Sequence, residues 1–112
     1  MKQAIVLNSA LKMGKGKTAA QSAHASLEAS LSVSKSVLEQ WRSEGMEKVV
    51  LKVSSDQELL QLHEKAKRRK LPCALIRDAG RTQIPAGSIT ALAIGPAEEK
   101  DVDEITGHLK LL

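Results

Sequence analysis

Short, almost continuous apolar runs alternate along the chain with longer segments that have helical periodicity. The apolar runs predict four strands, at residues 3–7, 48–53, 72–76 and 88–94. Strands of this kind are typical of sheets that are covered on both faces. The longer segments predict helices over about 18–36, 37–44, 55–69 and 98–106.

The order of these elements predicts an α/β fold. Helical segments separate the first three strands, which favours parallel crossovers. About eleven residues without a clear helix join the third and fourth strands, and this favours an antiparallel turn. We therefore expect a three-layer α/β/α sandwich on a four-stranded mixed sheet whose last strand is antiparallel. A chain of 112 residues is expected to form one domain, over residues 1–112.

Composition excludes several classes of protein. One Trp and no Tyr or Phe argue against modules that stack bases on aromatic side chains. The single cysteine, Cys73, excludes an intrachain disulfide and a multi-cysteine zinc site. No apolar stretch is long enough to suggest a membrane helix, and Met1 and Lys2 leave no room for a signal peptide before the first strand. The expected compartment is the reducing cytoplasm.

Charge is distributed unevenly around a net value of +4. Residues 1–17 hold four lysines and no acid, and residues 65–81 hold seven basic residues and one acid. Residues 97–112 hold five acids and two lysines. The two basic segments point to a polyanionic partner, of which a structured nucleic-acid backbone is the most plausible. The run at 65–70 is equally well explained as a solvated helix end, where cations are favoured.

A glycine-rich basic loop follows the first strand. It holds three lysines and two glycines: Lys12, Gly14, Lys15, Gly16 and Lys17. Glycines let a backbone approach a ligand closely, and a helix N-terminus favours an anion. The loop is not a Walker A motif, because Leu11 stands where its first glycine belongs. A merely solvated basic turn remains the alternative.

The predicted first helix carries a polar stripe. Lys17, Gln21, His24 and Glu28 are spaced four, three and four residues apart, so they share one side. An apolar stripe of Ala20, Ala23, Leu27 and Leu31 borders it and is expected to face the core. The polar stripe would then lie at the rim of a cleft. The alternative is a solvated helix edge with a structural histidine.

A second polar segment follows the third strand, and it contains Asp78, Arg81, Thr82 and Gln83. Ligands of parallel sheets bind beyond the carboxyl ends of strands, so this segment and Lys17 are expected to converge at one edge. A carboxylate can orient a water or accept its proton, and an ammonium can stabilise an oxyanion. Asp78 as a simple turn residue is the alternative.

The remaining reactive side chains carry weaker signals. Cys73 lies in an apolar strand with no neighbouring histidine, so a packing role is expected. His63 and His108 show no metal-ligand spacing, and Trp41 is expected to pack in the core. No metal or cofactor site is predicted.

Four segments resemble the archaeal and eukaryotic type 2 peptidyl-tRNA hydrolases. They are LKMGKGKTAAQSAHA at 11–25, IRDAGRTQIPAGS at 76–88, AIGPA at 93–97 and TGHLKLL at 106–112. The resemblance implies an α/β/α sandwich, a homodimer and hydrolysis of the ester between peptide and tRNA, without a cofactor. The family's functional residues match Lys17, Asp78 and Thr82, and its neighbouring positions match His24 and Gln83.

We therefore expect Asp78 to orient or deprotonate a water, with Thr82 assisting, and Lys17 to stabilise the tetrahedral oxyanion or to hold the terminal phosphate. Thr82 as a nucleophile is the less favoured route. Substrate-binding roles are expected for eight residues: Lys12, Gly14, Lys15, Gly16, Gln21, His24, Arg81 and Gln83. A non-catalytic RNA-binding domain or a protein-interaction module would be the competing interpretations.

Overall fold

The computed structural model describes residues 1–80 and 84–112. In these ranges the sheet has five strands in the order β3-β4-β1-β2-β5. The strands are β1 (Lys2–Asn8), β2 (Lys48–Val53), β3 (Cys73–Arg77), β4 (Ile89–Ala97) and β5 (Lys110–Leu111). The helices are α1 (Lys15–Ser30), α2 (Lys35–Ser43), α3 (Asp56–Arg68) and α4 (Glu99–Thr106), with a short 3-10 turn, η1 (Ser9–Leu11), before α1.

The mixed α/β sheet agrees with the sequence prediction, but the strand number was wrong. β1 pairs in parallel with β2, and β4 runs antiparallel to both β1 and β3. The strand that was missed, β5, pairs with the end of β2 through Leu111 and Lys110. Two residues are too few to show a periodic pattern, so no sequence signal marks this strand.

Strand β4 is also longer than predicted. Gly95 and Pro96 were expected to end it, yet the strand continues to Ala97. The register against β1 shifts between Lys2 and Ala4, so the Gly-Pro pair lies in an irregular, bulged part of the ladder. A bulge tolerates the missing N–H of proline. Gly95 has a φ of +103°, and a Cβ there would lie 2.4 Å from the Lys2 carbonyl oxygen.

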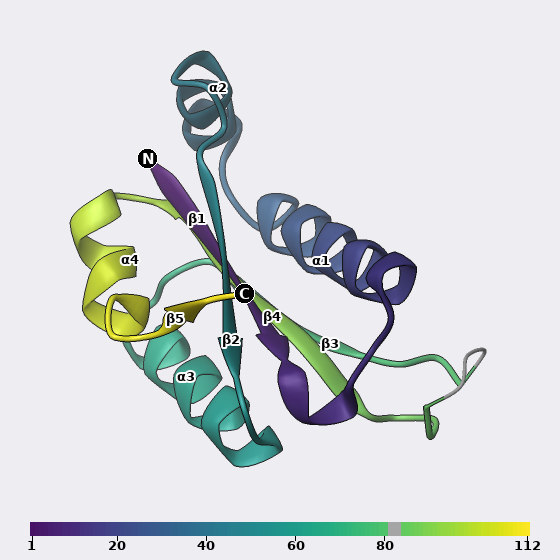
Figure 1. The fold of residues 1–112 in the computed structure, drawn as a ribbon. Coiled ribbons are helices and arrows are strands. Elements are labelled where there is room, and N and C mark those ends of the chain that lie inside the picture. Colours follow the sequence, from purple (N-terminus) through teal and green to yellow (C-terminus); the bar gives the residue numbers. More distant parts are fainter. Residues whose placement is uncertain (81–83) are drawn as a thin grey trace.

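Helices cover both faces of the sheet, which gives the three layers seen in Figure 1. One apolar core cluster lies between the sheet and helices α3 and α4 and includes Leu59, Leu62, Val102 and Ile105. The other cluster lies beneath α1 and includes Ala25 and Ala29. Ala74 and Ile76 of β3 pack in this second cluster, so α1 and β3 are neighbours, and the candidate site lies where β3 ends and α1 begins.

The buried face of α1 differs from the prediction. Leu27 and Leu31 are 59% and 69% exposed, and Ala20 and Ala23 are not buried either. The helix instead packs on the sheet through small residues and polar contacts. Gln3, fully buried on β1, donates to the Ser26 carbonyl oxygen at 3.2 Å and accepts from the Ser26 hydroxyl at 2.6 Å. Serine and alanine carry little apolar signal, so the larger leucines on the opposite side dominate the sequence pattern.

The first helical segment ends earlier than predicted. Residues 31–34 form a turn, and Ser34 caps α2 by accepting the Val37 N–H at 3.2 Å. Such a hydroxyl cap satisfies one of the free N–H groups at a helix start. The predicted helix over 18–36 therefore spans most of α1, the turn and the first residues of α2.

Candidate active site

The basic loop leads into α1 at the carboxyl end of β1. Gly14 occupies the N-cap position and has no side chain to cap the helix. Lys15, Gly16 and Lys17 form the first turn, so their N–H groups have no partner within the helix. Together with the helix dipole, these groups favour an anion in front of Gly14. Lys12 and Lys15 are exposed on either side of this position.

Asp78 lies directly after β3 at the same edge of the sheet. Its carboxylate is almost fully buried, at 2% exposure. Its Oδ2 accepts the Gly80 N–H at 2.8 Å, and its own main chain bonds to Ser88 and Gly87 at 2.8 and 2.9 Å. The Asp78 side chain is thus held by the backbone of Gly80, and its main chain by the backbone of Gly87 and Ser88. These contacts fix the position of Asp78.

The Lys17 ammonium forms an ion pair with the Asp78 carboxylate. The Lys17 side chain is 18% exposed, so this pair sits at the boundary between the interior and solvent. A lysine ammonium has three N–H donors. Within the described part of the chain, Lys17 uses only the one directed at Asp78. Its remaining donors are available to an oxygen that enters from solvent.

Three of the predicted site residues, Arg81, Thr82 and Gln83, lie outside the described residues. Of the others, the structure brings the loop lysines and glycines to the same edge as Asp78. Gln21 was expected at a cleft rim, but it is buried, and its Oε1 accepts from the Thr90 hydroxyl at 2.5 Å. This bond ties α1 to β4 close to the candidate site.

His24 is exposed and lines a groove between α1 and β3. The groove has a volume of about 460 Å³ and is also lined by Glu28, Leu75, Arg77 and Ala79. Ala79 directly follows Asp78, so the groove begins beside the ion pair. The polar stripe of α1 therefore does border a hollow, although the hydrophobic stripe beside it faces solvent.

Asn8 was not singled out from the sequence, although it ends β1 at this same edge. It is fully buried, and its Nδ2 donates to Asp56 at 2.6 Å and to the Ile89 carbonyl oxygen at 2.9 Å. Its Oδ1 accepts the Ala10 N–H at 3.2 Å. These bonds hold η1, β4 and the start of α3 together beneath the basic loop. A lone polar residue at the end of an apolar run was the available signal.

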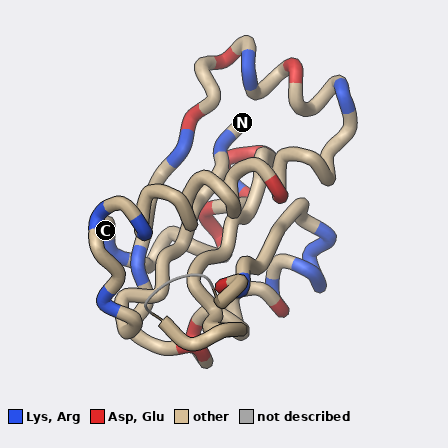
Figure 2. Tube along the Cα trace, turned by 90° about the vertical axis from the view of Figure 1, so that its right-hand side faces the viewer, with Lys and Arg blue, Asp and Glu red and all other residues tan. Residues whose placement is uncertain are grey.

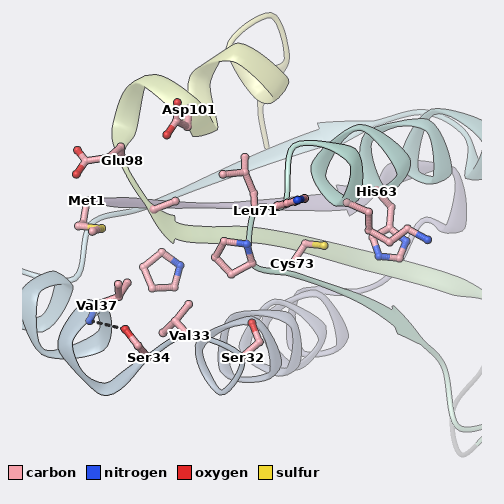
Figure 3. A pocket seen from close by; sticks show the side chains of 15 residues that line it. Met1, Ser32, Val33, Ser34, Val37, His63, Leu71, Cys73, Glu98 and Asp101 are labelled. Carbon is pink, nitrogen blue, oxygen red and sulfur yellow. Dashed lines mark hydrogen bonds between the residues drawn. The ribbon is translucent and has the colours of Figure 1, made fainter.

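A larger cavity, of about 730 Å³, lies at the opposite end of β3 from Asp78. Figure 3 shows Cys73 and His63 on its wall together with apolar residues such as Val33 and Leu71. Burial raises the pKa of the Cys73 thiol and lowers the pKa of His63. A thiol kept protonated is a poor nucleophile, and Cys73 also packs against the apolar core, in agreement with the expected packing role.

The chemistry available at the Lys17–Asp78 edge is that of an ammonium, a carboxylate and backbone N–H groups that have no partner within the helix. Residues 1–80 and 84–112 contain no group of three or more His, Cys, Asp or Glu residues that could hold a metal ion. In the same ranges, no helix is long and apolar enough to cross a membrane.

Comparison with known proteins identifies what the chain is similar to. The family described as "Peptidyl-tRNA hydrolase PTH2" matches residues 1–112. A protein of Methanococcus maripaludis (strain C6) named peptidyl-tRNA hydrolase is 54% identical, covering 98% of this chain and 97% of the relative. Proteins with the same name from Methanocaldococcus jannaschii and Halobacterium salinarum (strain R1) are 48% and 53% identical, covering 100% and 99% of both chains in each pair.

Proposed function

The chain belongs to the peptidyl-tRNA hydrolase PTH2 family, and we propose that Lys17 and Asp78 form the centre of its active site. It is a hydrolase that cleaves the ester bond between peptide and tRNA in peptidyl-tRNA, which returns free tRNA for reuse. The observation that carries the site assignment is the ion pair between a helix-start lysine and a buried carboxylate at the carboxyl ends of β1 and β3.

Asp78 acts on the attacking water in this proposal. Its carboxylate is held by the Gly80 N–H and by Lys17, so its position beside the start of the groove at Ala79 is fixed. Water adds to the ester carbonyl carbon as its proton passes to the carboxylate, and a tetrahedral intermediate forms. Collapse of this intermediate expels the ribose oxygen of tRNA, which takes up a proton, and leaves the peptide as a carboxylic acid. General-base help of this kind typically contributes about 100- to 10,000-fold.

Lys17 stabilises the negative charge that develops on the carbonyl oxygen. Its two remaining N–H donors and the free backbone N–H groups of the first turn of α1 belong to the same edge of the fold. One well-placed oxyanion donor lowers the barrier by roughly 3–4 kcal/mol. The family resemblance adds Thr82 as a third catalytic residue. The basic loop at the start of α1 favours an anion, so we assign substrate binding to Lys12, Gly14, Lys15 and Gly16.

The groove between α1 and β3 is the proposed place for the substrate chain next to the ester. It begins at Ala79, beside the ion pair, and runs past His24 and Glu28. Residues 81 and 83 extend the substrate contacts in this proposal, as the sequence resemblance suggests. The proposed mechanism uses no metal ion or cofactor.

We further propose that residues 1–112 act as a single domain that forms a homodimer in the cytoplasm. Leu27 and Leu31 support the dimer, because both are large apolar residues exposed on the outer side of α1. The two leucines are one helical turn apart, so they lie side by side on the helix surface and offer an apolar contact to a partner. A second copy of this chain is the simplest partner.

The test of the proposed function is cleavage of purified N-blocked aminoacyl-tRNA by the wild-type protein in EDTA. Release of tRNA and the blocked amino acid at a catalysed rate supports a metal-independent hydrolase. Tight tRNA binding without cleavage would favour the non-catalytic RNA-binding alternative. Salt-insensitive capture of a protein, with no tRNA binding, would favour the interaction module.

A further inference from the structure

One row of paired residues crosses the described sheet from edge to edge: Ile76, Ala91, Leu7, Lys52 and Lys110. Residues that face each other on neighbouring strands place their side chains on the same face. The first three pack in the core cluster beneath α1. The row therefore ends in two lysines that point to the face of the sheet on which α1 lies.

Lys52 and Lys110 are not covered by that helix. Helix α1 packs mainly across β4, β3 and β1, and both lysines are exposed. Figure 2 views the molecule from the side of α1, and Lys and Arg segments gather there around the end marked C. Lys12 and Lys15 of the basic loop are exposed as well, at the carboxyl end of the neighbouring strand β1.

The lysine pair has no neutralising partner in the part of the chain that the structure describes. Neither ammonium forms an ion pair or a hydrogen bond with an acidic side chain there. Directly opposed residues on antiparallel strands have Cβ atoms about 4.5–5.5 Å apart, and like charges at this separation are destabilising. A bound anion between or above them would relieve that repulsion.

The distance between the lysine pair and Asp78 indicates the size and charge of the ligand that would contact both. Ile76, at the other end of the row, lies in β3 two residues before Asp78, which directly follows that strand. With neighbouring strands about 4.8 Å apart, Lys52 and Lys110 lie roughly 15–20 Å from the end of β3. A ligand that is cleaved at Asp78 and also meets these lysines must extend across the sheet with negative charge along it.

We propose that Lys52 and Lys110 bind backbone phosphates of the tRNA stem that adjoins the ester-bearing 3′ end. This proposal rests on the proposed function and extends its substrate surface beyond the loop at 12–17. Contacts to phosphates carry no sequence information, which suits an enzyme that acts on many tRNAs. Lys12 and Lys15 of the loop are exposed and follow β1, which lies between β2 and β4 in the sheet, so the same tRNA strand could contact them as well.

The basic run at 65–70 is assigned no part in this surface. It ends α3 and leads to Cys73 at the start of β3, so it lies at the opposite end of that strand from Asp78. Within the run, Lys67 pairs with Glu64 at 3.0 Å and Arg69 pairs with Glu104. Part of its charge is therefore already neutralised by the protein, unlike that of Lys52 and Lys110.

The experiment compares Lys52→Gln/Lys110→Gln with Lys65→Gln/Arg68→Gln, because each variant removes two positive charges. Both are assayed on N-blocked aminoacyl-tRNA and on the same ester carried by a short single-stranded 3′-terminal oligonucleotide. The KM and kcat of each reaction are measured over a range of salt concentrations. Thermal unfolding of each variant is followed in parallel.

We expect the Lys52/Lys110 variant to raise KM for tRNA on the order of 10-fold at low salt, with kcat unchanged. The slope of log KM against log salt should fall by about two, one for each phosphate that the variant no longer neutralises. The short oligonucleotide should react as with the wild type, and Tm should not fall, because a repulsion is removed. The Lys65/Arg68 variant should match the wild type throughout.

Unchanged KM and salt slope for tRNA in the Lys52/Lys110 variant would overturn the proposal. An equal effect in the Lys65/Arg68 variant would also overturn it, since net charge alone would then explain the result. If the wild type binds tRNA but does not cleave it, the proposed function fails instead. The tRNA Kd of the two variants is then the test of the lysine pair. A higher Kd for the Lys52/Lys110 variant alone would support its role in binding, and equal Kd values would contradict it.

Discussion

The Lys17 ammonium rests against the Asp78 carboxylate, although 61 positions separate the two residues along the chain. The contact joins the first turn of α1 to the residue that follows β3, and the groove between α1 and β3 begins beside it at Ala79. Because the carboxylate is buried and the ammonium is partly exposed, solvent reaches the pair from the side of Lys17.

Replacing Lys17 should affect the chemical step more than binding. In Lys17→Met the oxyanion donor is removed, and we expect kcat on N-blocked aminoacyl-tRNA to fall roughly 100- to 1,000-fold. Lys17→Arg keeps the charge and should recover part of that decrease. Steady-state kinetics on the three proteins tests this. A Lys17→Met variant with a raised KM but normal kcat would place Lys17 in binding only.

Gly80 should prove essential because no larger residue fits its position. Its φ is +81°, and an added Cβ would lie 2.8 Å from the Ala86 Cβ. Its N–H also holds Asp78 Oδ2. Gly80→Ala should therefore lower kcat and stability together, with the backbone conformation alone costing about 1–2 kcal/mol.

Two further variants separate the effect of the positive φ from the effect of the steric clash with Ala86 at this turn. Gly87→Ala has a comparable φ of +83° but open space around the added methyl, so it should lose stability with less effect on kcat. Gly80→Ala/Ala86→Gly removes the collision and should recover part of the activity of Gly80→Ala. Denaturant unfolding and kcat are the two measurements. Because the Gly87 N–H also bonds to the Asp78 carbonyl oxygen, equal kcat for Gly80→Ala and Gly87→Ala would speak against a particular role of the Gly80 N–H in holding the Asp78 carboxylate.

The exposed leucines of α1 give a test of the proposed dimer. Leu27→Glu/Leu31→Glu should leave the stability of the protomer nearly unchanged, because both side chains are already largely exposed. The dimer should dissociate at micromolar protein concentration, since each protomer would have to bury two charges at the interface. Light scattering after size exclusion measures this. A dimer that persists in this variant would exclude this face of α1 as the interface.

His63 should make stability depend on pH. Its pKa in the folded protein is lowered by burial and by the nearby Lys67, so the folded state favours the neutral ring. The unfolded chain binds the proton more readily, and stability should therefore fall as pH drops below about 6.5. The comparison is Tm at pH 7 and pH 5 for the wild type and His63→Gln. The Tm of the wild type should decrease more between pH 7 and pH 5 than the Tm of His63→Gln. Identical decreases in Tm would refute this role of His63.

The mixed sheet and the proximity of Lys17 to Asp78 could be predicted from the sequence, because each follows from a strong local rule. Apolar runs mark buried strands, and parallel strands deliver their following loops to the same edge. The antiparallel turn into β4 followed from a short connection without a helix. These features need no knowledge of side-chain contacts.

The orientation of α1 was not accessible in the same way. Its buried side is held by serines, alanines and a bond from Thr90 to Gln21, whereas Leu27 and Leu31 remain outside. A pattern weighted by hydrophobicity selects the leucines. Strand β5 was not predicted because two residues are too few to show a periodic pattern. The sequence therefore also did not show that Lys52 and Lys110 face each other on neighbouring strands.

Single-turnover cleavage of N-blocked aminoacyl-tRNA by the wild type and Asp78→Asn, in EDTA, decides whether Asp78 activates the water. Asparagine keeps the size of the side chain but is a far weaker base, so the cleavage rate should fall about 100- to 10,000-fold. The Kd for tRNA should stay close to that of the wild type. Near-normal cleavage by Asp78→Asn would show that another group activates the water and would remove Asp78 from the centre of the site.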